Sequence, residues 1–179
     1  MRHYFMRSAR LGFGLWNAHD LPVAHELWGD ATVTKLTEGP YTPAQVADRL
    51  DREILNQRQH GFQYWPLFDL RTGSHVGCCG LQPRIPARGI CELGYQLRSD
   101  HWGQRYAIEA GESVIAHAFS TLGVVELFAG HHPENIRSKR VLLSLGFAYT
   151  HDELYPPTGK LEPAYRLGRD DYFRSTAAR

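Results

Sequence analysis

The residues between a predicted strand and a predicted helix, Trp102-Gly-Gln-Arg-Tyr106, have the composition and position of an anion-binding turn. From Cys91 to Leu97 polar or small residues alternate with apolar ones, the period of two expected for a strand with one packed face. From Tyr106 to about Leu122 apolar side chains recur at helical spacing. The turn would therefore present free backbone N–H groups at the positive end of a helix dipole, where a pyrophosphate is stabilised. The same local pattern also occurs in folds that bind no phosphate.

A second stretch, from Pro133 to Phe147, predicts a helix that carries two polar residues with possible chemistry. Ser138 shares a helical face with Leu142 and the other apolar residues, so its hydroxyl should point toward the body of the domain. Asn135 stands near the start of the helix, where asparagine commonly caps the first turn. A helical serine often bonds only a preceding carbonyl, so residue types alone leave both roles open.

Together the two stretches resemble the GNAT superfamily of acyl-CoA-dependent N-acetyltransferases, and within it the ribosomal-protein N-terminal acetyltransferase branch. The turn of that branch reads like Tyr-Trp-Gly-Lys-Gly-Tyr-Ala-Thr-Glu-Ala, and this chain has His101-Trp-Gly-Gln-Arg-Tyr-Ala-Ile-Glu-Ala110. The family pattern Asn-x-x-Ser-x-x-x-Leu-x-x-Leu-Gly-Phe is matched at Asn135, Ser138, Leu142, Leu145, Gly146 and Phe147. The resemblance extends from about Leu11 to Leu167.

The resemblance implies that acetyl-CoA is the acyl donor and that its pyrophosphate lies in the turn. In that fold the strands before and after the central helix splay apart, and the thioester lies in the gap. The unpaired strand edge around Tyr95 to Leu97 could then bond the pantetheine amides. The implied cofactor-binding residues are Tyr95, Leu97, Trp102, Gly103, Gln104, Arg105, Tyr106, Ala107, Asn135 and Ser138.

One residue of the turn departs from the family pattern, because Arg105 stands where the second glycine is expected. Glycine there lets the backbone approach the phosphates without a Cβ in the way. We expect Arg105 to adopt an ordinary helical φ and to turn its side chain aside. It then either supplies a cation to the pyrophosphate or distorts the turn and weakens cofactor affinity, and the helical position favours retained binding.

Acetyl transfer to an amine needs a neutral amine, a path for its proton, an oxyanion donor and a proton for the departing thiolate. The resemblance implies that Ser138 donates the last proton, although many family members place a tyrosine there. It also implies that Asn135 bonds the cofactor or the region of the substrate amine. These two residues and a base make up the predicted catalytic set.

The base is not decided by the sequence. Glu92 matches the family's Glu-Leu-Gly-Tyr and lies on the strand face opposite Tyr95, where it lines the acceptor groove or faces solvent. His131 and His132 follow the next strand, and an unperturbed histidine pKa near 6.5 suits a base at neutral pH. Glu92 is our candidate, with the two histidines and water as alternatives.

Composition restricts the other classes of protein. A chain of 179 residues with 42% hydrophobic residues suits one domain over residues 1–179. A net charge of +1 without a basic face argues against direct nucleic-acid binding and against a polycationic acceptor. No stretch approaches the roughly 20 apolar residues of a membrane span, and residues 1–10 do not resemble a secretory signal. Three cysteines do not suggest a disulfide framework, so we expect a cytoplasmic protein.

Several motif-based chemistries find no support. No Cys-x-x-Cys or His-x-x-x-His spacing suggests a metal site, so none is expected. No Gly-x-Ser-x-Gly elbow or Walker sequence suggests a serine hydrolase or an NTPase. Cys78 and Cys79 lie outside both motifs and are not candidate nucleophiles.

The predicted fold is an α/β (α+β) domain, a GNAT-like three-layer αβα arrangement around a central, mostly antiparallel, splayed mixed sheet. Thr42-Pro-Ala-Gln45 predicts a capped helix to about His60, whose charged residues, Arg49 among them, should face solvent. Residues 82–89 should form a loop and residues 174–179 a frayed tail. The predicted strands cover residues 9–16, 62–70, 75–81, 91–97, 124–130, 147–155 and 164–168, and the remaining helices run from 17 or 20 to 28, from 103–106 to 122 and from 133 to 145.

The function predicted at this point is direct acetyl transfer from acetyl-CoA to a primary amine in a ternary complex, without a covalent acyl-enzyme. The acceptor is either a protein N-terminal α-amine or a small-molecule amine. The alternative is an inactive acyl-CoA-binding or regulatory module of the same fold. The sequence leaves the oligomeric state open, including a homodimer.

Overall fold

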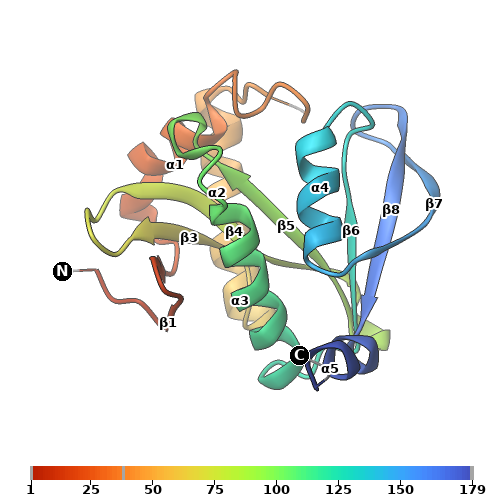
Figure 1. Cartoon of the computed structure of the whole chain (residues 1–179). Helices are drawn as coiled ribbons and strands as arrows, with labels where there is room; N and C mark the ends of the chain where they lie inside the picture. Colours follow the sequence, from red (N-terminus) through yellow and green to blue (C-terminus); the bar gives the residue numbers. More distant parts are fainter. Residues whose placement is uncertain (1, 38, 178–179) are drawn as a thin grey trace.

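A computed structural model describes residues 2–37 and 39–177, and eight strands in this part of the chain form one sheet (Figure 1). Their order is β1-β2-β3-β4-β5-β6-β8-β7, and every neighbouring pair is antiparallel except β5 and β6. The expected mixed, mostly antiparallel sheet is confirmed. The strands are β1 (Met6–Arg7), β2 (Leu11–Phe13), β3 (Tyr64–Asp69), β4 (His75–Ile85), β5 (Ile90–Leu97), β6 (Glu126–Gly130), β7 (Ala148–Tyr155) and β8 (Lys160–Gly168).

Helices cover both faces of the sheet, which confirms the three-layer arrangement. Alternation along the strands decides which face each residue packs on. Tyr64 and Cys78 face the layer of α1 (Leu21–Trp28) and α2 (Pro43–His60). Trp65 and Cys79, one residue further along, face the larger core under α3 (Tyr106–Ser120) and α4 (Ile136–Ser144). The predicted capping box at the start of α2 forms between Thr42 and Gln45.

The sheet splays between β5 and β6. Only Ile90 to Glu92 of β5 pair with β6, at Glu126 to Phe128. From Leu93 to Leu97, β5 continues beside β4, while β6 continues beside β8 to Gly130. The edge of β5 that faces β6 is therefore unpaired over residues 93–97, and α4 lies on the far side of the gap (Figure 1). The expected splay is confirmed.

The prediction of a loop over residues 82–89 is wrong for the first half of that range. β4 extends to Ile85, with Gln82 opposite Glu92 and Pro83 opposite Cys91, and only Pro86–Arg88 form a short 3₁₀ turn. Pairing with β3 ends at Gly80, and the last bond to that side joins the Leu81 N–H to the Gln63 carbonyl, so Pro83 lies beyond the paired part of this edge. Proline is tolerated at such an edge, where its missing N–H costs no ladder bond.

The described part of the chain ends in a helix, α5 (Arg169–Ala177), where a frayed tail was predicted from Arg174. Its first turn carries two acidic residues, which suit the positive end of a helix dipole. Tyr172 packs against the ring of Phe119 at 5.3 Å between centroids. Local sequence does not reveal this long-range contact. Residues 178 and 179 lie outside the described residues.

Three further boundaries differ from expectation. The strand predicted over residues 9–16 is only β2, and it pairs with the unpredicted β1. The last strand is longer than predicted, because β8 begins at Lys160 in a hairpin with β7. α4 begins at Ile136 because the side chain of Asn135 caps it. Among the described residues, no helix has the length and apolarity needed to cross a bilayer.

Candidate active site

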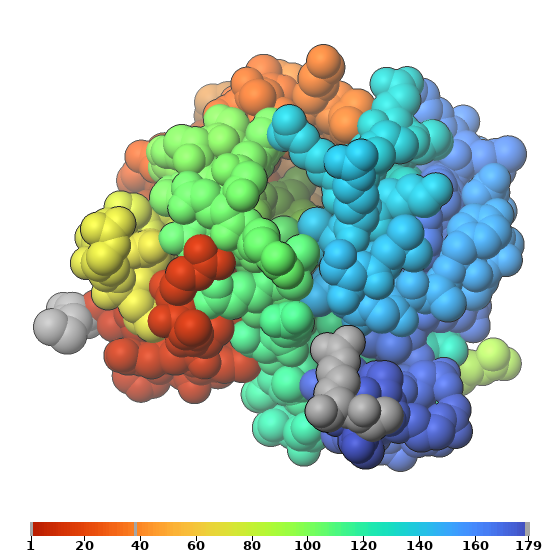
Figure 2. All heavy atoms as spheres, in the orientation of Figure 1, coloured from red at the N-terminus to blue at the C-terminus, as the bar shows by residue number. Residues whose placement is uncertain are grey.

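A groove of about 1220 Å³ runs between the start of α3 and α4, under the segment around residues 32–37. Figure 2 shows the surface hollowed between the green and cyan parts of the chain, below the orange segment. Of the predicted cofactor-binding residues, Gln104 alone does not line this groove; it is exposed. The residues that do are Tyr95, Leu97, Trp102, Gly103, Arg105, Tyr106, Ala107, Asn135 and Ser138.

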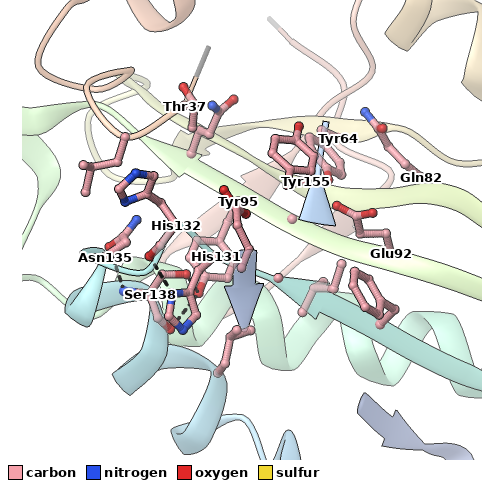
Figure 3. Close-up of a pocket in the computed structure, with 18 of the residues that line it drawn as sticks. Thr37, Tyr64, Gln82, Glu92, Tyr95, His131, His132, Asn135, Ser138 and Tyr155 are labelled. Carbon is pink, nitrogen blue, oxygen red and sulfur yellow. Dashed lines mark hydrogen bonds between the residues drawn. The ribbon is translucent and has the colours of Figure 1, made fainter. Parts of the chain in front are cut away.

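A smaller pocket of about 220 Å³ adjoins the groove at the splay. Figure 3 shows its two ends, one with Ser138 and Asn135 and the other with Glu92 and Gln82, while Tyr95 lies between them. The groove and the pocket share part of their walls, so they meet where the two halves of the sheet diverge. The shared residues are Leu36, Thr37, Tyr95, Gln96, Asn135 and Ser138.

The turn before α3 is left-handed at two residues. Gly103 has φ 78°, and Arg105 has φ 63° and ψ 16°. The expectation of an ordinary helical φ for Arg105 is therefore wrong, because the arginine keeps the backbone shape that suits a glycine. A side chain in this region costs about 1–2 kcal/mol, so contacts outside the turn must stabilise it. The first bond along the helix joins the Glu109 N–H to the Arg105 carbonyl, so the N–H groups of residues 106–108 have no helical acceptor.

Two aromatic side chains anchor the turn. The Trp102 indole N–H donates to the Leu97 carbonyl at 2.8 Å. The Tyr106 hydroxyl donates to a carboxylate oxygen of Asp69 at 2.7 Å, on the end of β3. This hydrogen bond, with those from Thr72 and the backbone of Arg71, lowers the pKa of Asp69 to about 2 despite its burial. Tyr106 is buried, so its side chain holds the turn in place. Sequence reasoning missed Asp69, whose only signal is its position before a turn.

Tyr95 and Ser138 face each other across the splay. Their hydroxyl oxygens are 2.8 Å apart, and the Tyr95 hydroxyl also lies 3.2 Å from the Ser138 carbonyl. Burial raises the pKa of Tyr95, so the phenol is protonated at neutral pH. The predicted orientation of Ser138 toward the body of the domain is confirmed. The asparagine beside them, Asn135, accepts the Ser138 N–H at 3.0 Å through Oδ1 and so caps α4.

Glu92 lies at the other end of the pocket, on the predicted face of β5. Gln96, on the same face, accepts the Trp28 indole N–H at 2.8 Å. Burial raises the pKa of Glu92, and Glu153 acts in the same direction, while Arg84 at 3.8 Å opposes them. Such a carboxylate is a stronger proton acceptor than an exposed one.

Both histidines after β6 are buried, and their ring nitrogens are already engaged. His131 lies 2.8 Å from the His132 carbonyl through Nδ1 and 3.3 Å from the Tyr165 hydroxyl through Nε2. His132 accepts the Glu134 N–H through Nδ1, and its Nε2 lies 2.8 Å from Lys160 Nζ. A base needs a free lone pair within reach of the amine, so this geometry favours Glu92 over either histidine.

A buried ion pair forms the wall behind the pocket. Glu53 has no exposed surface and accepts hydrogen bonds from Arg49 Nε at 2.8 Å, the Tyr64 N–H at 2.8 Å and Gln82 Nε2 at 3.2 Å. The prediction that Arg49 faces solvent is therefore wrong. Its side chain is 14% exposed, with the guanidinium carbon 5.2 Å from the centre of the Trp28 ring. Sequence reasoning missed Glu53, because the spacing of charges on α2 suits a solvated face equally well.

Two other chemistries find no support in the described residues. In the described ranges, no group of three or more His, Cys, Asp or Glu side chains could hold a metal ion. Cys78 and Cys79 are fully buried, and burial raises the pKa of both thiols, to about 12 for Cys78. Neither thiol is therefore available as a thiolate nucleophile at neutral pH.

The splayed sheet, the left-handed turn at the start of α3 and the groove between them define the acyltransferase fold expected from the sequence. Residues 10–148 match the family model described as the acetyltransferase (GNAT) domain. The chain belongs to the GNAT acetyltransferase family, and its enzyme class is that of the N-acetyltransferases.

Known proteins resemble the chain over most of its length. An uncharacterized N-acetyltransferase, p20 of Bacillus licheniformis, is 29% identical over 142 residues, which are 78% of this chain and 80% of the relative. The ribosomal L7/L12 alpha-N-protein acetyltransferase RimL superposes with a TM-score of 0.80 at 14% identity, covering 94% of this chain and 95% of that one. An aminoglycoside acetyltransferase solved with coenzyme A and kanamycin superposes with a TM-score of 0.77 at 15% identity, covering 93% of this chain and 99% of that one.

Proposed function

We propose that the protein transfers an acetyl group from acetyl-CoA directly to a primary amine, with the donor in the groove and the amine in the pocket. The observation that carries this proposal is the meeting of the two cavities at Tyr95 and Ser138. A long donor and a small acceptor can approach each other only at such a junction. Family membership supports acetyl-CoA as the donor.

The residues that line the groove suit the parts of acetyl-CoA. The open N–H groups after Arg105 would bind the pyrophosphate, and the guanidinium of Arg105 would add a positive charge beside it. The unpaired edge of β5 near Tyr95 to Leu97 would bond the pantetheine amides. These contacts use mostly backbone atoms, so the arginine at the second glycine position does not remove them.

In this proposal the amine nitrogen attacks the thioester carbonyl carbon, the C–N bond forms and the C–S bond breaks. The hydroxyl pair of Tyr95 and Ser138 supplies the proton that the thiolate takes up. Glu92, acting through water, accepts the proton that the amine loses. Asn135 keeps Ser138 in place by capping α4, and its amide remains on the wall of both cavities.

The pocket favours a cationic acceptor of small cross-section. Glu153 on β7 stands directly opposite Glu162 on β8, and both line the pocket with Glu92. Like charges placed opposite each other are destabilising, and an ammonium group would offset this repulsion. Arg84 bonds Glu153 and reduces the negative charge at one end. A peptide α-amine or a small amine fits this volume and charge.

Calorimetry and turnover test the proposal together. Acetyl-CoA should bind the wild type with micromolar affinity, about −8 kcal/mol, and thiol release should occur with some members of a panel of peptide and small-molecule amines. Tyr95→Phe and Ser138→Ala should each lower kcat by about 10²-fold without abolishing acetyl-CoA binding. The double variant should lose little more than the worse single, because the two hydroxyls act as a unit.

Tyr149→Phe is the matched control, because this tyrosine is exposed and bonds Asp152 away from the pocket. It should leave kcat unchanged. Binding without turnover on any amine would instead support an acyl-CoA-binding module. Absence of binding would overturn the proposed function.

A further inference from the structure

One arginine outside the turn contacts the residues on both sides of Arg105. Arg10, just before β2, donates from Nη2 to the Gln104 carbonyl at 3.0 Å. Its guanidinium carbon lies 4.3 Å from the centre of the Tyr106 ring. A single side chain therefore connects the N-terminal segment to the part of the turn that has the unusual backbone.

Arg10 is itself held in position by Glu109. The Glu109 carboxylate accepts the Arg10 backbone N–H at 2.7 Å, Arg10 Nε at 2.6 Å and the Ser8 hydroxyl at 2.6 Å. Glu109 belongs to the first turns of α3, so the guanidinium is fixed relative to the helix that the turn precedes. An arginine with its backbone and side chain both bonded to one carboxylate loses little further freedom when it also bonds a carbonyl.

The bond to the Gln104 carbonyl acts on the torsion that is strained. That carbonyl belongs to the peptide group joining Gln104 to Arg105, and its orientation is coupled to φ of Arg105. Rotation to a right-handed φ would turn the peptide group and move this oxygen away from Arg10. Arg105 makes no side-chain cap to α3, so the contact from Arg10 favours the left-handed form that its own side chain disfavours.

We propose that Arg10 is a positioning residue, which holds the Gln104–Arg105 peptide in the orientation that the phosphate-binding turn requires. It performs for this chain what a glycine at residue 105 would do without help. The inference rests on the proposed function only for the identity of the ligand, coenzyme A. The coupling between residues 10 and 105 is a property of the fold itself.

A double-mutant cycle tests the inference with Arg10→Ala, Arg105→Gly and the combined variant. With Arg105 present, Arg10→Ala should weaken calorimetric binding of coenzyme A about tenfold, a typical coupling between groups in contact. In the Arg105→Gly background the same change should have little effect. Binding of acetyl-pantetheine, which lacks the pyrophosphate, should not change in any variant.

Arg7→Ala is the matched control, because Arg7 contacts the ring of Tyr4 and is exposed on the neighbouring β1. It should change neither ligand's affinity. An equal loss from Arg10→Ala in both backgrounds would overturn the inference, since it would show that Arg10 supports only general stability. Loss of acetyl-pantetheine binding would overturn it for the same reason.

Amide hydrogen exchange over residues 102–108, measured without ligand, separates this inference from the proposed function. Arg10→Ala should speed exchange more when Arg105 is present than in the Arg105→Gly background. If the wild type binds no coenzyme A but shows this difference, the proposed function fails and the positioning role stands. If Arg10→Ala speeds exchange by the same factor in both backgrounds, the positioning role fails whatever the ligand result.

Discussion

The groove and the pocket are built in different ways. The groove is lined mostly by one contiguous stretch, from the end of β5 through the turn into α3, together with α4 and the segment around residues 32–37. The pocket is lined by residues from α2, α4 and strands β3 to β8, and from the segments around residues 36–41 and 131–135. Local sequence can therefore specify the first, whereas only the complete fold assembles the second.

The two regions are also supported differently. The turn beside the groove depends on hydrogen bonds that reach it from β3 and from the N-terminal segment, at Asp69 and Arg10. The pocket wall depends on the ion pair between the fully buried Glu53 and the largely buried Arg49. A change in the first support should weaken donor binding as well as stability, whereas a change in the second should lower stability and disturb the acceptor pocket.

Glu53→Gln should have the largest effect. It leaves Arg49 buried without its counter-ion, and breaking a buried pair in this way costs about 3–5 kcal/mol of unfolding free energy. Urea unfolding measures the loss. Where the variant remains folded, KM for the amine should rise while the affinity for coenzyme A stays close to that of the wild type.

Asp51→Asn is the control for Glu53→Gln, because Asp51 is exposed on the same helix. It should change the unfolding free energy by less than about 0.5 kcal/mol. A similarly small loss of unfolding free energy in Glu53→Gln would show that the ion pair does not support the pocket wall.

Asp69→Asn should have the next largest effect, on the donor side. The pKa of Asp69 is lowered from 3.8 to about 2, so the carboxylate contributes about 2 kcal/mol of stability at neutral pH. Because the folded pKa is depressed, this contribution is present above the ordinary pKa and is lost as the pH falls through about 4 to about 2. Unfolding measured against pH should show this fall in the wild type and a flatter profile in the variant.

The same variant should weaken coenzyme A binding, because Tyr106 loses the carboxylate that fixes the turn. Asp48→Asn, at an exposed residue of α2, provides the comparison. If Asp69→Asn lowers stability but leaves coenzyme A affinity intact, the turn does not depend on this anchor. The effect of Asp69 would then be confined to the end of β3.

The contiguous parts of the site could be predicted from the sequence. The turn from Trp102 to Tyr106 was recognisable because a strand period, a glycine and a helical period follow one another directly. Ser138 was oriented correctly from helical spacing alone. The αβα fold and the splayed sheet followed from the family resemblance that these motifs carry.

The parts that were missed depend on contacts between distant residues. Tyr95 and Ser138 are 43 residues apart, and only the splay brings their hydroxyls together. The left-handed backbone of Arg105 contradicts local preference. The side chain that contacts it at the Gln104 carbonyl is Arg10, 94 residues earlier in the chain. Arg49 appeared to belong to a solvated face, because nothing local shows that Glu53 bonds both Tyr64 and Gln82.

The smallest predicted effect concerns Glu92, and it separates catalysis from support. As a base, Glu92 must be deprotonated, so kcat/KM of the wild type should rise as the pH passes through its raised pKa. Glu92→Gln should remove this acidic limb and lower kcat/KM by about tenfold, with water taking the proton. Glu126→Gln, at a residue that pairs with Arg166 outside the pocket, should keep the limb. A limb that persists in Glu92→Gln would contradict the role of Glu92.

Stability should change in the opposite direction. A carboxyl whose folded pKa is raised contributes stability that is fully present below its ordinary pKa and is lost as the pH rises through the folded value. At neutral pH the partly buried carboxylate is therefore a cost to folding, and Glu92→Gln should be as stable as the wild type or more stable. A residue that only supported the pocket would lose activity and stability together. Opposite changes in the pH–rate profile and in urea unfolding would show that the acceptor side of the site keeps an unfavourable charge for its chemistry.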